Sequence, residues 1–175
     1  MTLTIRHERD DDHGSVREVQ GQAFGDGDRV PGLVDALRAL RPVSLVAVAG
    51  ERVVGHVMLN PCRLDAPRRL VDVYSLSPLA VLPEFQGQGI GTALVARALE
   101  EAEGSGLPLV FLEGSPRYYG KRGFEDATEL DFRPPTLRYP PGTFQVARMS
   151  SYEDWMTGTF IYSDPFWAHD CVGHR

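Results

Sequence analysis

Hydrophobic and polar residues follow patterns along the chain that predict alternating helices and strands. Residues 2–7 have the composition of a short strand. Apolar residues then recur at helical spacing over residues 16–24 and 30–40, which predicts two helices. Three aspartates at residues 10–12 precede the first helix, and we expect them to cap its N-terminus, where the helix dipole favours carboxylates. Pro42 ends the second helix.

The middle of the chain predicts strands. Residues 44–50 and 52–61 are rich in β-branched residues and are separated by a very short connection, which predicts an antiparallel hairpin. Residues 70–82 form a third such run. Pro78 lies in the middle of this run, and because proline has no N–H to donate to a neighbouring strand, we expect the strand to be interrupted there.

The second half of the chain starts with a glycine-rich stretch and then takes on helical character from residue 90. Gly104 and Gly106 are the stop signals of this helix. Residues 107–114 are predominantly apolar and predict a compact strand. Residues 116–124 predict a short helical or turn segment.

Weaker strand candidates lie at residues 127–132 and 143–149, on either side of a proline-rich loop. Residues 150–175 are rich in aromatic side chains, and a segment this apolar is expected to dock on a surface rather than to stay free. We therefore divide the chain into a domain at residues 1–149 and an extension at residues 150–175. The extension docks either on the domain or on a partner subunit, which would make the protein a homodimer.

The composition is that of a globular protein with one sizeable core. The chain has 175 residues, of which 42% are hydrophobic and 24% charged, and its formal net charge is −6. A negative charge and scattered basic residues disfavour nucleic-acid binding. No apolar run approaches the roughly 18 residues of a membrane span, so we expect a soluble, cytoplasmic protein without membrane contacts. Cys62 and Cys171 are too few for a disulfide framework, and we expect both to be reduced.

The glycine-rich stretch between Leu82 and Ile90 has the arrangement of an anion-binding loop. Glycine permits positive φ and close approach of a ligand to the backbone, and a helix N-terminus offers unpaired N–H donors. A pyrophosphate fits such a loop, although the glycines alone are equally compatible with a tight turn. Two nucleotide motifs do not fit: no Gly-Lys-Ser or Gly-Lys-Thr is present for a P-loop, and Thr92 stands where the dinucleotide fingerprint needs glycine.

The residues from Gln86 to Gly91, QGQGIG, resemble the acyl-CoA signature of the GNAT superfamily of N-acetyltransferases. That signature has Gln or Arg, then Gly three residues later, then Gly or Ala two residues after that, and the match is complete. The segment YYGKRGF, which ends at Phe124, is similar to the family element FYxxxGF and follows about 30 residues later, in the family's order. The resemblance implies an α/β fold with a mixed, mostly antiparallel central sheet, splayed fourth and fifth strands, and flanking helices.

The resemblance also implies acetyl-CoA as co-substrate. In the family, the fourth strand after its bulge pairs through its backbone with the pantetheine amides, and the N–H groups of the following loop hold the pyrophosphate. Carried onto this chain, the cofactor-binding residues are Leu79, Ala80, Val81, Gln86, Gly87, Gln88, Gly89, Ile90, Gly91 and Thr92.

Acetyl transfer from a thioester to an amine needs a neutral nucleophile, donors for the oxyanion and a proton for the leaving thiolate. The resemblance places Tyr119, four residues before Gly123, at the tyrosine that supplies this proton, whereas Tyr118 is expected to pack. Glu113, at the end of the predicted fifth strand, is the candidate base, and attack without a dedicated base is the alternative. The expected reaction is direct acetyl transfer to a primary amine of a small molecule.

Two other interpretations concern the cofactor motif and the C-terminal residues. A non-catalytic acyl-CoA-binding sensor or interaction module would carry the same cofactor motif, and only turnover on an amine separates it from an enzyme. His169, Cys171 and His174 offer nitrogen and sulfur ligands, but they lack a fourth partner for structural zinc, so we expect no metal.

Overall fold

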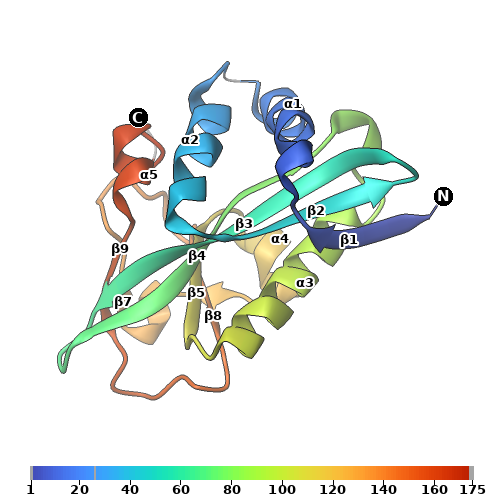
Figure 1. Ribbon diagram of the computed structural model, residues 1–175. Coiled ribbons are helices and arrows are strands. Elements are labelled where there is room, and N and C mark those ends of the chain that lie inside the picture. The colour runs from blue at the N-terminus through green and yellow to red at the C-terminus, as the bar shows by residue number, and fades with distance from the viewer. Residues whose placement is uncertain (1, 26, 174–175) are drawn as a thin grey trace.

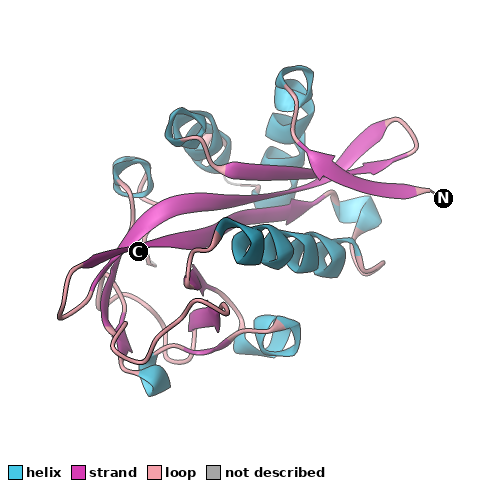
Figure 2. Cartoon of the chain, turned by 60° about the horizontal axis from the view of Figure 1, so that its bottom comes forward, coloured by secondary structure: helices cyan, strands magenta, loops and turns pink. Residues whose placement is uncertain are grey.

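The computed structural model describes residues 2–25 and 27–173 of the chain. In this part, one nine-stranded sheet carries helices on both faces (Figure 1, Figure 2). α1 (His13–Phe24) and α2 (Arg29–Leu37) cover one face, and α3 (Ile90–Ser105) covers the other. The predicted class, a mixed sheet between helices, is confirmed.

Most neighbouring strands of the sheet are antiparallel. The order is β1 (Leu3–His7), β2 (Val43–Ala49), β3 (Arg52–Asp65), β4 (Leu70–Val81), β5 (Leu109–Glu113), β8 (Phe144–Arg148) and β6 (Glu125–Asp126). The hairpin predicted for β2 and β3 is confirmed. β4 and β5 are parallel, and their ladder is limited to the rungs Tyr74–Val110 and Ser75–Phe111. The C-terminal part of β4 therefore leaves β5, which gives the predicted splayed pair.

The interruption predicted at Pro78 is a shift in the pairing of β3 with β4. Val57 lies opposite Leu79, whereas Leu59 lies opposite Leu76, so β4 carries an additional residue between these rungs. An irregularity of this kind bends a strand and changes the direction of the residues after it. The part of β4 that follows the proline is thereby aimed away from β5 and toward the start of α3.

The helices largely follow the predicted pattern. Ile90, Leu94 and Ala98 of α3 are buried, and α2 continues as a 3-10 turn, Arg38–Leu40, before Pro42. These buried positions recur at helical spacing because only one side of each helix meets the sheet.

The expectation that the aspartates cap α1 is wrong. They form a 3-10 turn of their own, Asp10–Asp12, and no side chain caps α1. Asp12 instead accepts a hydrogen bond from the N–H of Arg9 at 2.7 Å and pairs with the guanidinium of Arg6 at 2.7 Å. The carboxylate is engaged by the residues before it, so it is not available to the helix after it.

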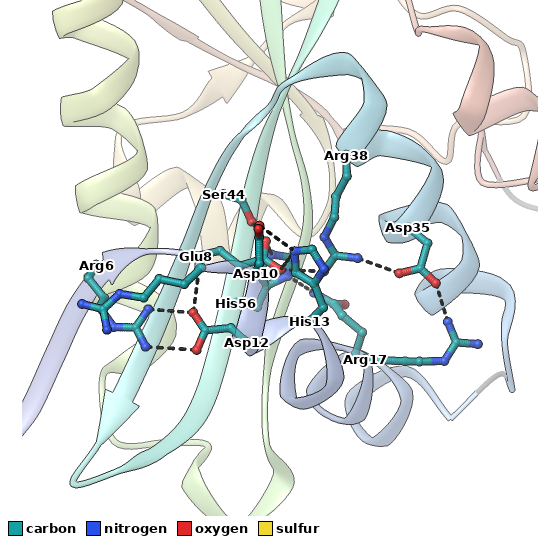
Figure 3. A network of polar contacts seen from close by, with 12 residues as sticks. Arg6, Glu8, Asp10, Asp12, His13, Arg17, Asp35, Arg38, Ser44 and His56 are labelled. Carbon is teal, nitrogen blue, oxygen red and sulfur yellow. Dashed lines mark hydrogen bonds and ion pairs between the residues drawn. The ribbon is translucent and has the colours of Figure 1, made fainter.

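A polar network joins α1 and α2 to β2 and β3 (Figure 3). His56 of β3 is fully buried. Its ring nitrogens lie 2.7 Å from the amide nitrogen of Gln20 and 2.8 Å from the hydroxyl of Ser44. Glu8 accepts a hydrogen bond from the Ser44 hydroxyl and lies 2.6 Å from a guanidinium nitrogen of Arg38. The network ties the helical layer to the sheet.

The strand predicted over residues 127–132 is wrong. β6 ends at Asp126, whose carboxylate accepts a 2.9 Å hydrogen bond from the N–H of Thr128, the first residue of a 3-10 turn. Asp131 then adopts a left-handed conformation with φ of 65°. Aspartates favour such turns because their side chains bond the nearby backbone. A two-residue strand, β7 (Phe132–Arg133), follows.

Residues 150–173 pack against the part of the chain that precedes them. β9 (Gly158–Ile161) pairs with the end of β3 and with β7, and α5 (Asp164–Ala168) lies beside α2 (Figure 1). Phe160, Tyr162 and Phe166 are buried in the common core. The division into a domain and an extension stays a prediction, as does a second subunit. None of the helices in the described ranges has the length and hydrophobicity needed to cross a bilayer.

Candidate active site

A cavity of about 360 Å³ lies where β4 ends and α3 begins. Its lining contains all of the predicted cofactor residues except Gln88, whose side-chain amide is 3.4 Å from the carbonyl of Glu84. Sequence considerations did not assign three of the lining residues to the site: Phe85, Tyr118 and Arg122. The lining is Leu79, Ala80, Val81, Phe85, Gln86, Gly87, Gly89, Ile90, Gly91, Thr92, Tyr118 and Arg122.

The floor of this cavity is a loop whose shape depends on glycine. Gly87 and Gly89 have φ of 75° and 84°, a region that residues with a Cβ adopt only with strain. Gly89 is the N-cap of α3, and no side chain caps this helix end. The first N–H groups of α3 therefore have no partner within the helix, and the positive end of the helix dipole lies at the cavity. An anion fits this position.

Gln86 fixes the loop to the strand before it. Its side-chain amide donates a 3.0 Å hydrogen bond to the carbonyl of Val81, the last residue of β4. Gln86, the first residue of the signature, thus connects the end of β4 with the glycine loop. This bond holds the free end of β4 and the glycine loop in one fixed arrangement.

Tyr118 and Arg122 form the wall opposite the loop. The Tyr118 hydroxyl lies so close to Gly91 that a Cβ on that residue would overlap it. The guanidinium of Arg122 lies 3.6 Å from the centroid of the Tyr118 ring, and its Nε donates a 3.0 Å hydrogen bond to the Thr92 hydroxyl. The signal in the sequence was the spacing of four residues between Tyr118 and Arg122, which places both side chains on one side of the short helical segment.

Tyr119 does not line the cavity. Its ring packs edge-on against Phe124, with centroids 5.6 Å apart, and it lies against Gly114 just after β5. Burial raises the pKa of Tyr119 above its usual value, so the phenol is protonated at neutral pH. The side chain of Tyr118 thus lies next to the start of α3, whereas the side chain of Tyr119 lies next to the end of β5.

Glu113 is the last residue of β5 and lies near the buried Tyr162 and the partly buried Tyr139 from the C-terminal region. Tyr139 donates a 3.1 Å hydrogen bond to the hydroxyl of Tyr162. Burial raises the pKa of both phenols, and the negative charge of Glu113 adds to the rise in each. Glu113 is therefore next to an aromatic surface built by the loop before β8 and by the segment after β9.

The C-terminal histidines and cysteine form no recognisable metal centre in the described residues, where no group of three metal-binding side chains comes together. His174 lies outside the described residues. Neither Cys62 nor Cys171 forms a disulfide within the described residues.

A strand that separates from its parallel neighbour, followed by a glycine loop and a helix N-terminus, defines the class of acyl-CoA-dependent acyltransferases. Residues 4–127 match the family model described as the acetyltransferase (GNAT) domain. The chain belongs to the GNAT family of acetyl-CoA-dependent N-acetyltransferases.

Two curated relatives come from Escherichia coli. The uncharacterized N-acetyltransferase YjhQ of strain K12 is 33% identical over 117 residues, and this match covers 65% of each protein. The uncharacterized N-acetyltransferase YhbS of the same strain is 31% identical over 128 residues, which covers 71% of this chain and 74% of YhbS.

Two solved structures resemble nearly the whole chain. E. coli YhbS in complex with CoA has a TM-score of 0.84 at 28% identity and covers 94% of this chain and 91% of its own. A GNAT acetyltransferase from Brucella melitensis in complex with acetyl-CoA has a TM-score of 0.77 at 29% identity, with 94% and 98% covered.

Proposed function

We propose that the protein transfers the acetyl group of acetyl-CoA to a primary amine of a small molecule. The observation that carries the proposal is the cavity in which the free end of β4, the glycine loop and the start of α3 meet. The structures of relatives with CoA and acetyl-CoA support the same donor here.

In this proposal, the backbone of Leu79, Ala80 and Val81 pairs with the amides of the pantetheine arm, because the splay leaves this part of β4 without a strand partner on the β5 side. The N–H groups from Gln86 to Thr92 bind the pyrophosphate. A backbone N–H near Ala80 or Val81 stabilises the oxyanion. The site needs no metal in this scheme, because backbone donors and a helix dipole supply the charge stabilisation.

The chemical step is direct transfer. The amine nitrogen attacks the thioester carbonyl carbon, the C–N bond forms and the C–S bond breaks, and the nitrogen loses a proton to Glu113, directly or through water. The thiolate takes a proton from the Tyr119 hydroxyl, which solvent then restores. Burial keeps the Tyr119 phenol protonated at neutral pH, so its proton is present when the thiolate forms, but the raised pKa makes the transfer of that proton less favourable.

The acceptor is proposed to be small because of what surrounds Glu113. Tyr139 and Tyr162 are joined to each other by a hydrogen bond and lie close enough to feel the negative charge of Glu113. Aromatic rings near a carboxylate suit a compact amine, since the rings and the negative charge both favour a cation. An extended peptide would need an open groove in the same place.

The test is turnover by the full chain with acetyl-CoA and a panel of primary amines, followed by release of free thiol and by mass spectrometry of the product. Acetylation of an amine that falls strongly in Tyr119→Phe supports the proposal. Tyr152→Phe is the control, because it removes a tyrosine hydroxyl that does not line the cavity. Tight CoA binding without acetylation of any amine would instead favour a sensor.

A further inference from the structure

One charged side chain lines the cofactor cavity among the described residues, that of Arg122. Arg122 belongs to a 3-10 turn that follows the short helix α4 (Pro116–Tyr119), outside the glycine signature. We propose that Arg122 is a side-chain ligand of the diphosphate of the acetyl donor and that Tyr118 and Thr92 hold it in place. The inference rests on the proposed function, because it assumes that the donor occupies this cavity.

Three contacts fix the guanidinium at the first turn of α3. Its Nε donates to the Thr92 hydroxyl at 3.0 Å, its Nη1 donates to the carbonyl of Tyr118, and its plane lies over the Tyr118 ring. Side-chain entropy is the main cost of using a long arginine to hold a ligand. Because these contacts already order Arg122, little of this cost is left for the binding step.

In the described part of the chain, the guanidinium of Arg122 is not neutralised by a negatively charged side chain. Within residues 2–25 and 27–173, no carboxylate forms an ion pair with Arg122, and its Nη2 has no hydrogen-bond partner. Arg52, Arg97 and Arg148 are each ion-paired with a glutamate. An ordered guanidinium with a free N–H edge is suited to bind the oxygens of a phosphate group.

The position of Arg122 favours the diphosphate of the donor as its ligand over the 3′-phosphate. Thr92, its partner, belongs to the same first turn of α3 whose N–H groups face the cavity. Arg122 and Thr92 also line a second cavity of about 640 Å³ beside α3, which Lys121 borders as well. A donor that extends from the first cavity toward the second passes Arg122 with its diphosphate, whereas Glu100 and Glu103, which also line the second cavity, disfavour a phosphate group beyond it.

The experiment compares dissociation constants of CoA, dephospho-CoA and pantetheine for the wild type and Arg122→Met. A charge-assisted contact predicts a loss of about tenfold or more for both phosphorylated ligands. Pantetheine, which has no phosphate, should bind both proteins equally. Arg122→Lys should retain part of the affinity, because it keeps the charge but loses the planar fork.

Arg117→Met is the matched control, because Arg117 is an exposed arginine of the same segment that lines neither cavity. Unchanged affinity of Arg122→Met for CoA, with a wild type that binds CoA, overturns this inference and leaves the proposed function standing. A loss confined to CoA and absent for dephospho-CoA also overturns it, because the arginine would then bind the 3′-phosphate. A wild type that binds neither ligand is the distinct result that refutes the proposed function.

Tyr118 is a positioning residue in this proposal, and its part is tested by a double-mutant cycle. Tyr118→Leu removes the ring under the guanidinium and should weaken CoA binding several-fold in the wild type. In the Arg122→Met background the same change should have little effect. Equal losses in both backgrounds would show that Tyr118 contacts the donor independently and would overturn the positioning role.

Discussion

The side-chain amide of Asn60 donates a 2.5 Å hydrogen bond to the carbonyl of Ser77, the residue just before the proline at which β4 changes its pairing. Asn60 is fully buried in β3, and its own amide oxygen has no partner among the described residues. The bond therefore crosses from one strand to the irregular part of the next. It is the side-chain contact that fixes where β4 bends into the cofactor cavity.

Asn60→Leu keeps the approximate volume and removes this donor. We expect a loss of about 1–3 kcal/mol in the free energy of unfolding, because the carbonyl of Ser77 loses a buried partner. We also expect a higher dissociation constant for CoA, because the residues after Pro78 lose their fixed direction. Urea unfolding and CoA titration measure the two effects.

The control for this prediction is Gln145→Leu. Gln145 is equally buried and donates to the carbonyl of Gly142, but it lies in β8 and does not line the cavity. It should lose stability while keeping the wild-type affinity for CoA. If both variants lose affinity in proportion to stability, Asn60 has no special part in shaping the site.

Gly91→Ala should weaken CoA binding by tenfold or more, because the new methyl group overlaps the Tyr118 hydroxyl and overpacking of this kind costs about 1–3 kcal/mol. Removing the hydroxyl in Gly91→Ala/Tyr118→Phe should restore most of the affinity. The nearest ring atom is then 3.7 Å from the methyl group, which is ordinary contact. CoA titration of the two variants and of Tyr118→Phe alone completes the test.

Gly89→Ala provides the contrast. Its φ of 84° makes any side chain strained, and no atom lies close to the added methyl group. Tyr118→Phe should therefore not rescue it. Rescue of both glycine variants would mean that the Tyr118 hydroxyl, and not the local geometry, explains the loss.

Local pattern predicted most of the elements that build the site, and long-range contacts account for what it missed. The strand with Pro78 and the helix starting at Ile90 follow from neighbouring residues, so both were correct. The bond from Asn60 to Ser77 depends on the register of two strands, which periodicity does not give. The weak strand pattern over residues 127–132 does not form a strand, because Asp126 and Thr128 form a turn there.

The two tyrosines show the same limit at the site. The motif spacing assigns Tyr119 to the site and Tyr118 to packing, whereas in the structure Tyr118 lines the cavity and Tyr119 packs beside β5. The difference comes from the packing of the segment against Gly91 and Gly114, which accept the two side chains. A motif can therefore identify a segment before it identifies which of its residues lines the cavity.

Tyr119→Phe should lower kcat by about 100-fold or more and leave the affinity for CoA nearly unchanged, because a general acid acts in the chemical step. Steady-state kinetics and CoA titration separate the two effects. Since burial raises the pKa of Tyr119, the wild-type rate should show no loss from its ionisation up to pH 10. An unchanged kcat in Tyr119→Phe would remove Tyr119 from the mechanism.

The network of Glu8 and His56 predicts acid sensitivity of the fold. Burial disfavours the Glu8 carboxylate, but the His56 ring 3.7 Å away and the hydrogen bonds from Ser44 and Arg38 outweigh it and lower the pKa of Glu8 to about 2. Burial lowers the pKa of His56 as well. Both groups bind protons more readily in the unfolded chain than in the folded one. The free energy of unfolding should therefore fall as the pH drops below about 6.5, where His56 is protonated on unfolding. It should fall further between about pH 4.5 and 2, where Glu8 contributes on the order of 3 kcal/mol.

Urea unfolding across this pH range measures both steps. Glu8→Gln should remove the lower step, whereas Glu125→Gln, at an exposed ion pair with Arg148, should keep it. A lower step that persists in Glu8→Gln would assign it to other carboxylates.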